Sequence, residues 1–125
     1  MSAGNVYIRL AKEGSTILIN GTGAAKATTE AFTVPSKAGC QFSYQIKASG
    51  TTPRVSIKLL ASYDGVNYVV PEDMSSALIT VADSNRHIKA FSPTYAMSYK
   101  VQIDGDSGNG ADTYIDELYI GYTRN

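Results

Sequence analysis

Segment 41–48 alternates strictly between polar and apolar residues. The apolar positions are Phe42, Tyr44, Ile46 and Ala48, and the polar positions are Gln41, Ser43, Gln45 and Lys47. Because successive side chains of a β-strand point to opposite faces, this pattern predicts an antiparallel strand that is buried on one face. The pattern returns at 54–59, with Val55, Ile57 and Leu59 inward, and again at 98–104. Three segments therefore predict strands that pack on a common core.

Amino-acid composition and the positions of turn-forming residues extend this prediction to the whole chain. Val, Ile and Tyr together contribute 27 residues and Leu and Met only 9, which favours strands over long exposed helices. Further strands are expected at 6–10, 16–19, 26–34, 66–70, 77–82, 87–91 and 113–123, and Gly, Pro, Asp or Asn stands at nearly every junction. We expect one all-β domain over residues 1–125. Its predicted architecture is an antiparallel β-sandwich, jelly-roll-like, with about eight to ten short strands, and a small barrel is the alternative.

The last of these segments departs from clean alternation. Tyr114, Leu118, Ile120 and Tyr122 share one parity, whereas Ile115 and Tyr119 share the other. We expect a strand that is central and covered on both sides, or one that contacts another subunit. The neighbours Asp116 and Glu117 should point to opposite faces, which excludes them as a catalytic carboxylate pair.

Charge excludes two kinds of partner. Eleven Lys and Arg balance eleven Asp and Glu, so no net positive field is available to hold nucleic acid or anionic lipid. The net charge of zero is the sum of two opposite charges, because residues 1–62 carry +5 and residues 63–125 carry −5. The two halves either interleave in the sandwich or segregate into basic and acidic surfaces that meet copies of the chain or a charged partner. No stretch of the sequence approaches a membrane span, and no signal peptide is visible, so synthesis in a cytoplasm is expected.

The most specific motif surrounds Asp64 and Gly65, which suit a tight turn between two strands. Ser62 and Asn67 can bond backbone groups beside this turn, and Tyr68 can pack back over the preceding strand. The pattern Ser-x-Asp-Gly-x-Asn-aromatic resembles a hairpin of small β-sandwich virion proteins of tailed bacteriophages. It also resembles a hairpin of some bacterial carbohydrate-binding and discoidin-like domains. The aromatic residue of those relatives is usually Trp, whereas this chain has Tyr.

Segments 99–105 and 113–122 resemble the closing pair of strands in the same phage proteins. The resemblance implies a non-enzymatic virion structural protein, made in the host cytoplasm and acting by homo-oligomeric assembly with phage capsid or tail proteins. Capsid decoration or cement and neck or tail accessory roles both fit this class. The alternative is a carbohydrate- or receptor-binding β-sandwich module, against which the absence of Trp counts. A small enzyme is the third and least favoured function class.

Assembly would bury apolar and Tyr-rich surface. Tyr44 and Tyr99 are expected in the core, because they lie on apolar strand faces. The expected contact elements are the N-terminal segment 2–7, the hairpin at 64–68 and the last strand. Their candidate interface residues are Tyr7, Asp64, Gly65, Asn67, Tyr68, Tyr119 and Tyr122.

Two possible chemical sites are weak. Asp104, Asp106 and Asp112 lie in a Gly-rich loop that could supply oxygen ligands to Ca²⁺, but their spacing does not match an EF-hand, and an ordinary solvated loop needs the same residues. Cys40 and His87 could form a thiolate pair, yet no motif flanks the cysteine, and a packed thiol is the favoured interpretation. We therefore expect no catalytic residues and no cofactor.

Overall fold

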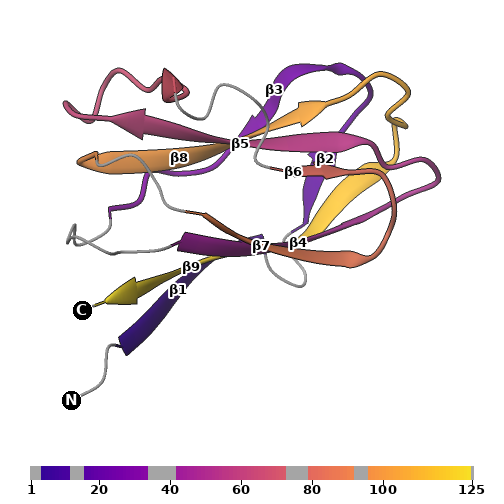
Figure 1. The fold of residues 1–125 in the computed structure, drawn as a ribbon. Coiled ribbons are helices and arrows are strands. Elements are labelled where there is room, and N and C mark those ends of the chain that lie inside the picture. The colour runs from indigo at the N-terminus through magenta and orange to yellow at the C-terminus, as the bar shows by residue number, and fades with distance from the viewer. Residues whose placement is uncertain (1–3, 12–15, 34–41, 73–78, 92–95, 125) are drawn as a thin grey trace.

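The computed structural model describes residues 4–11, 16–33, 42–72, 79–91 and 96–124. These residues form strands joined by loops (Figure 1). The strands are β1 (Gly4–Ala11), β2 (Ile17–Ile19), β3 (Gly23–Thr28), β4 (Phe42–Ser49), β5 (Val55–Ser62), β6 (Ile79–Val81), β7 (Arg86–Phe91), β8 (Ser98–Gly105) and β9 (Thr113–Arg124).

The strands form two antiparallel sheets, which lie one above the other in Figure 1. The lower sheet has the order β1-β9-β4-β7, with β2 pairing a further stretch of β9, and the upper sheet has the order β3-β8-β5-β6. The pairs β1 with β9, β3 with β8, β4 with β7 and β5 with β6 are those of one long hairpin. This hairpin is rolled up so that β9 meets β4 and β8 meets β5. The predicted jelly-roll sandwich is therefore confirmed.

The core lies between the two sheets and follows the alternation in the sequence. All four apolar positions of β4 are buried, and Val55, Ile57 and Leu59 of β5 meet them from the upper sheet. Tyr99 of β8 packs its ring edge-on against Phe42, with ring centroids 5.3 Å apart. Tyr44 is also buried, as predicted, so both core tyrosines come from strands with a clean period of two.

The two halves of the chain interleave completely in the described strands. In both sheets, strands that end by residue 62 alternate with strands that begin after it. Ion pairs join the halves: Lys47 Nζ lies 3.5 Å from Asp116 Oδ2, and Lys58 Nζ lies 2.8 Å from Asp104 Oδ2. The basic and acidic halves therefore cancel locally, and the alternative of two segregated charged surfaces is wrong for these strands.

A β-bulge in β9 overturns two expectations. Lys47 is paired with Glu117 and Ala48 with Ile115, so Asp116 is an extra residue in the ladder. The bulge resets the alternation, and Ile115, Leu118 and Ile120 are all buried on the core side. Ile115 was expected on the face opposite Leu118, which is wrong. Asp116 and Glu117 both contact outward-facing side chains of β4, so the expectation that they point to opposite faces is also wrong.

The predicted strand at 66–70 is instead a loop with one bridge, between Ala61 and Val69. The predicted strand at 26–34 is displaced toward the N-terminus as β3, and Phe32 forms a separate bridge with Tyr99. In the described part of the chain, no helix is long and apolar enough to cross a lipid bilayer.

Candidate interaction surface

The loop that follows β5 is folded around the carboxylate of Asp64. Its Oδ1 accepts hydrogen bonds from the backbone N–H groups of Val66 and Asn67, at 2.8 Å each, and from Ser62 Oγ at 2.9 Å. Its Oδ2 accepts a hydrogen bond from Asn67 Nδ2 at 2.7 Å. The Ser62 hydroxyl oxygen in turn accepts the N–H of Gly65, a residue with φ of +74°. Asp64, Gly65 and Asn67 therefore form a closed network that holds the loop in one shape.

This network also shifts the protonation of Asp64. The backbone N–H of Asn67, followed by that of Val66, lowers the pKa of Asp64 far below its ordinary value, although the side chain is exposed. Both carboxylate oxygens are used within the loop. Asp64 therefore acts as a scaffold for the loop: three donors occupy Oδ1 and one occupies Oδ2.

Tyr68 anchors the far end of the loop. Its hydroxyl lies 2.8 Å from Ser98 Oγ, and the ammonium group of Lys100 lies 4.4 Å from its ring centroid. Both partners belong to β8, which is the neighbour of the preceding strand β5 in the upper sheet. Two backbone hydrogen bonds between Ala61 and Val69, at 2.8 and 3.1 Å, close the loop.

The anchored loop exposes large apolar side chains. Val66 is 78% exposed, Tyr63 70% and Val69 64%, and Met97, whose N–H donates to the Ser62 carbonyl, is 57% exposed. We call these four residues the loop patch. Two of them, Tyr63 and Val69, line an open hollow of about 380 Å³, together with Ala61, Ser62, Asp64, Asn67 and Pro71. Single exposed apolar residues are ordinary, but three on one pre-folded loop, with Met97 bonded to the start of that loop, indicate an interaction site.

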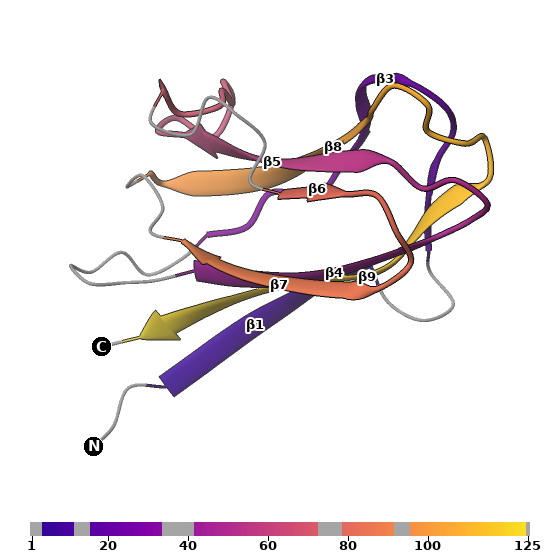
Figure 2. The same ribbon diagram turned by 45° about the vertical axis from the view of Figure 1, so that its right-hand side comes forward.

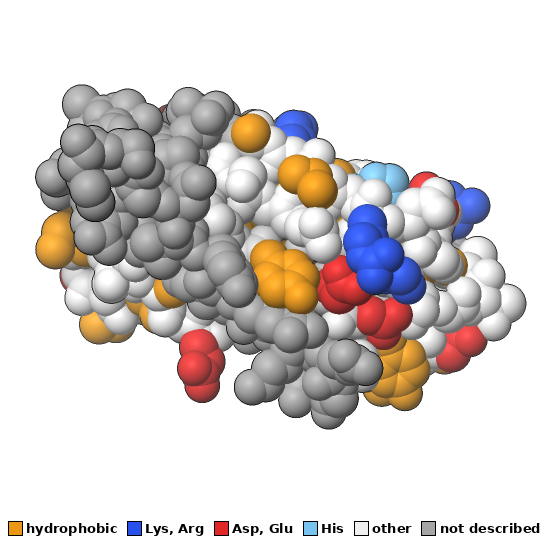
Figure 3. Space-filling model, turned by 90° about the horizontal axis from the view of Figure 1, so that it is seen from below, with side chains coloured by type: hydrophobic (Ala, Val, Ile, Leu, Met, Phe, Trp, Pro, Cys, Tyr) orange, Lys and Arg blue, Asp and Glu red, His pale blue; other side chains and the backbone are white. Residues whose placement is uncertain are grey.

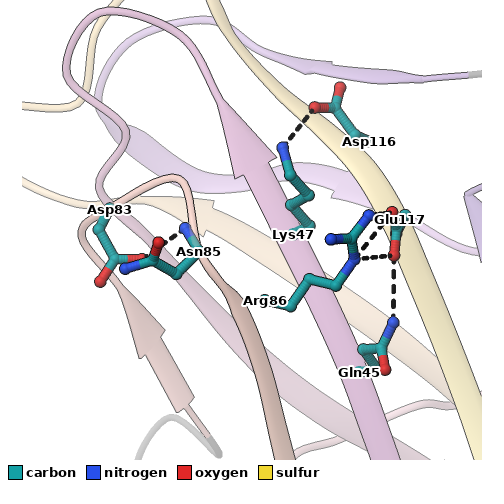
Figure 4. Close-up of polar contacts among 7 residues, drawn as sticks. All are labelled: Gln45, Lys47, Asp83, Asn85, Arg86, Asp116 and Glu117. Carbon is teal, nitrogen blue, oxygen red and sulfur yellow. Dashed lines mark hydrogen bonds and ion pairs between the residues drawn. The ribbon is translucent and has the colours of Figure 1, made fainter.

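A row of polar and charged side chains lies on the outer face of the lower sheet. Arg86 of β7 makes a two-pronged ion pair with Glu117 of β9, with Nε 3.0 Å from Oε1 and Nη2 2.7 Å from Oε2. Gln45 of β4, which lies between these strands, donates to Glu117 Oε1 at 3.1 Å. Figure 4 shows Lys47 and Asp116 continuing this row along the same two strands, β4 and β9. The row ties three adjacent strands together.

The hydrogen bond from Arg86 is the main cause of a lowered pKa at Glu117, and the same contact raises the pKa of Arg86. Figure 3 shows blue and red side chains in contact on this face, with hydrophobic side chains beside them. Tyr119, opposite Gln45 in the ladder, is half-buried, and Ile88 is 71% exposed. Exposed ion pairs contribute little to stability, so this row adds little to the free energy of folding.

The three carboxylates considered for Ca²⁺ have separate partners. Asp104 bonds Lys58, Asp106 accepts a hydrogen bond from Ser56 Oγ at 2.6 Å, and Asp112 accepts two from Thr51. Burial opposes ionisation of Asp104, but its hydrogen bonds, led by that of Lys58, leave its pKa lowered. No group of three or more His, Cys, Asp or Glu that could hold a metal occurs within the residues that the structure describes.

Asn109 is the important residue of this loop, and the sequence patterns did not single it out. Its Nδ2 donates to the carbonyls of Ile19 and Gly21, and its Oδ1 accepts from the N–H of Arg54 and from Thr113 Oγ1. All four distances fall between 2.8 and 2.9 Å, and the residue is buried. Asn109 is therefore a buried clasp between the sheets at one end of the sandwich, within a loop whose neighbouring residues are exposed or half-buried.

The hypothesis of a thiolate pair between Cys40 and His87 cannot be placed in full, because Cys40 lies outside the described part of the chain. His87 lies on β7, where its Nε2 is 2.7 Å from Asp83 Oδ1, and this hydrogen bond is the main cause of a lowered pKa at Asp83. Figure 4 shows Asp83 also accepting a hydrogen bond from the backbone of Asn85. His87 therefore has a local structural partner at the turn before β7.

The predicted interface residues fall into two groups on different sheets. Asp64, Gly65, Asn67 and Tyr68 belong to the loop after β5 in the upper sheet. Tyr7, Tyr119 and Tyr122 belong to the paired strands β1 and β9 of the lower sheet, with Tyr7 opposite Gly121 and Val6 opposite Tyr122. The side chains of Tyr7 and Tyr122, and residues 2–3 of the N-terminal segment, lie outside what the structure describes.

No protein-family model matches the chain, and no curated protein matches it. The functional argument therefore depends on the fold and on its surfaces.

Proposed function

We propose that the protein is a non-enzymatic structural component of a phage virion, a capsid decoration or cement protein or a neck or tail accessory. It is made in the host cytoplasm and acts by docking on virion proteins and on copies of itself. The observation that carries this proposal is the loop patch, a set of exposed apolar side chains of which three lie on a loop that is already folded. A loop held in one shape loses little conformational entropy when it docks.

The fold supports the same class of function. Jelly rolls occur in viral capsid proteins, lectins and cupins, so the architecture is compatible with the proposal and does not select it. The Ser-x-Asp-Gly-x-Asn-aromatic pattern, by which the sequence resembles small virion proteins, coincides with the network that shapes the loop patch. The motif of the resemblance and the apolar surface are thus one element.

Docking would work through burial of apolar surface. Fully burying one Val or Tyr-sized side chain contributes roughly 1.5–3 kcal/mol, so the loop patch could supply several kilocalories per mole at each contact. Repetition over many copies on a shell would then stabilise the assembled particle by mass action, with no chemical step.

A carbohydrate- or receptor-binding module is the second candidate. One observation favours it: Tyr63 is 70% exposed and lines the open hollow, and aromatic rings can pack on sugar faces. The geometry of Asp64 counts against it, because the loop already uses Oδ1 for three hydrogen bonds and Oδ2 for one, which leaves one acceptor position for a sugar hydroxyl.

Light scattering of the purified protein, together with a glycan array, separates the two candidates. The proposal predicts a defined oligomer whose mass is a whole multiple of 13.3 kDa, and no glycan signal above background. A monomer at every concentration that binds a defined glycan class would reject the proposal in favour of the second candidate.

A further inference from the structure

The outer strands of the two sheets, among the described residues, are β1, β2 and β7 in the lower sheet and β3 and β6 in the upper sheet, and β2 has only three residues. An outer strand leaves a row of backbone N–H and C=O groups unpaired, and another chain can pair with it. Proteins commonly block such edges by making the strand short, by a bulge, by a lysine or by a charged residue on the core-facing side. The edges of this molecule differ in this respect.

The upper sheet has two blocked edges. β6 contains only three residues. β3 has a register shift between Gly23 and Ala27, and within it Ala25 has φ of +50° and donates its N–H to Asp104 Oδ1 at 2.7 Å. The exposed Lys26 lies in the same irregular stretch. Neither strand offers a regular template to a further strand.

The free edge of β7 is blocked in another way. His87 and Lys89 lie opposite Ile46 and Tyr44, whose side chains are buried, so both occupy core-facing positions of the sheet. A strand added beside β7 would have to extend the core next to a lysine. Polar residues at core-facing positions of an edge strand oppose such pairing.

β1 lacks these devices along most of its length. It has eight residues, contains no proline and carries one charge, at Arg9. Its register with β9 is continuous from Gly4 to Arg9 and shifts only between Arg9 and Ala11. Among the described residues, β9 is its single strand partner, and Figures 1 and 2 both show β1 as the outermost strand of the lower sheet.

We propose that the free edge of β1 pairs antiparallel with β1 of a second copy of this chain, so that two lower sheets become one continuous sheet across a two-fold axis. Antiparallel pairing of identical strands is self-complementary. A register centred on Tyr7 sets Val6 opposite Ile8 and Asn5 opposite Arg9, which matches apolar with apolar positions and keeps the two Arg9 residues apart. The zero net charge of the chain removes long-range repulsion between copies.

This inference goes beyond the proposed function, because it assigns a contact between copies to a surface other than the loop patch. The two contacts are structurally independent, since β1 belongs to the lower sheet and the loop patch follows β5 of the upper sheet. Either can fail while the other holds.

The test uses two neighbouring proline variants, Val6→Pro and Tyr7→Pro. In an antiparallel edge strand, successive N–H groups point alternately toward the paired strand and toward the free edge. One proline therefore removes a bond to β9 and lowers the thermal midpoint. The other keeps the wild-type midpoint when both proteins are melted as monomers, below the dissociation constant, but raises the dissociation constant of the dimer by about tenfold or more, measured by sedimentation velocity.

Hydrogen exchange of the wild-type protein gives a second readout that needs no variant. Amides of β1 should exchange more slowly above the dissociation constant than below it. Val66→Asp serves as the control, because it alters the loop patch and should leave the dimer unchanged. The inference is overturned by a monomeric wild type at all concentrations, by wild-type dissociation constants in both proline variants, or by β1 exchange that does not depend on concentration.

Discussion

At the scale of single residues, two polar side chains organise most of the loop structure. Asn109 joins four backbone and side-chain groups from separate segments of the chain, and Asp64 gathers the loop after β5. Neither role follows from the sequence pattern alone. An Asn or an Asp in a Gly-rich stretch is typical of any exposed turn, and only the folded chain shows which of them is buried and fully bonded.

Replacing Asn109 tests its role in the clasp. Asn109→Ala leaves two carbonyls, one N–H and one hydroxyl without partners, and we expect the free energy of unfolding to fall by about 3 kcal/mol or more. Asn109→Asp at neutral pH sets a carboxylate against the carbonyls of Ile19 and Gly21, so its pKa should rise. Relative to wild type, Asn109→Asp should regain stability as pH falls and its carboxyl becomes a donor, whereas Asn109→Ala should not. Urea unfolding at several pH values measures both, and equal pH profiles for the two variants would contradict the assignment.

The loop network makes a separate prediction about Asp64. Because its pKa is lowered by the N–H groups of Asn67 and Val66, the amide resonances of those two residues should stay in place as pH falls through the range in which an ordinary Asp titrates, near 3.9. Asp64→Ala should move these two resonances toward random-coil positions at every pH. NMR titration of the wild type measures the effect, and movement with a midpoint near 4 would show that the network does not form in solution.

At the scale of elements, the sequence predicts strands well wherever one face is buried and the ladder is regular. The ends of β4, β5 and β8 differ by at most three residues from the ends of the segments predicted by alternation, 41–48, 54–59 and 98–104. The prediction of a strand at 66–70 is wrong because local hydrogen bonds to Asp64 compete with strand pairing, and Val66 and Val69 of this segment are exposed. In β9 the apolar positions change parity across Asp116 and Glu117, and this change is the signal by which the bulge could have been found.

Single-residue deletions in β9 test the bulge. Deleting Asp116 removes the extra residue and leaves Ile115, Leu118 and Ile120 in strict alternation, so the fold should survive with a loss of about 1–2 kcal/mol. Deleting Tyr119 turns Ile120 toward solvent and should cost several kcal/mol or abolish cooperative unfolding. Thermal unfolding followed by circular dichroism compares them, and equal damage from the two deletions would argue against the bulge.

At the scale of the whole molecule, the jelly roll interleaves the two halves of the chain and so converts a separation of charge along the sequence into ion pairs between neighbouring strands. The result is a neutral body with displayed apolar side chains on one loop and one unblocked strand edge. The candidate contact residues named from the sequence lie on the loop after β5 and on β1 and β9. Their separation onto different sheets required the topology.

Acid should destabilise this body through its carboxylates. The pKa is lowered at Asp64, Asp83, Asp104, Asp112 and Glu117. Each of these groups stabilises the folded state above its unfolded pKa of about 4, and the contribution is lost as pH falls through the lower folded value. The urea midpoint should therefore be flat from pH 7 to about 5 and fall below that. A midpoint that rises on acidification would contradict these shifts.

The central claim, that the protein is a virion component, is tested most directly by quantitative mass spectrometry of purified particles from a host that expresses it. Tagged wild type, Val66→Asp and the exposed control Ile88→Asp would be compared at equal expression. The account predicts wild type and Ile88→Asp in the particles at a fixed ratio to the major capsid protein, and a severalfold loss of Val66→Asp. Wild-type chain that remains free in the host extract while the particles lack it would contradict the claim.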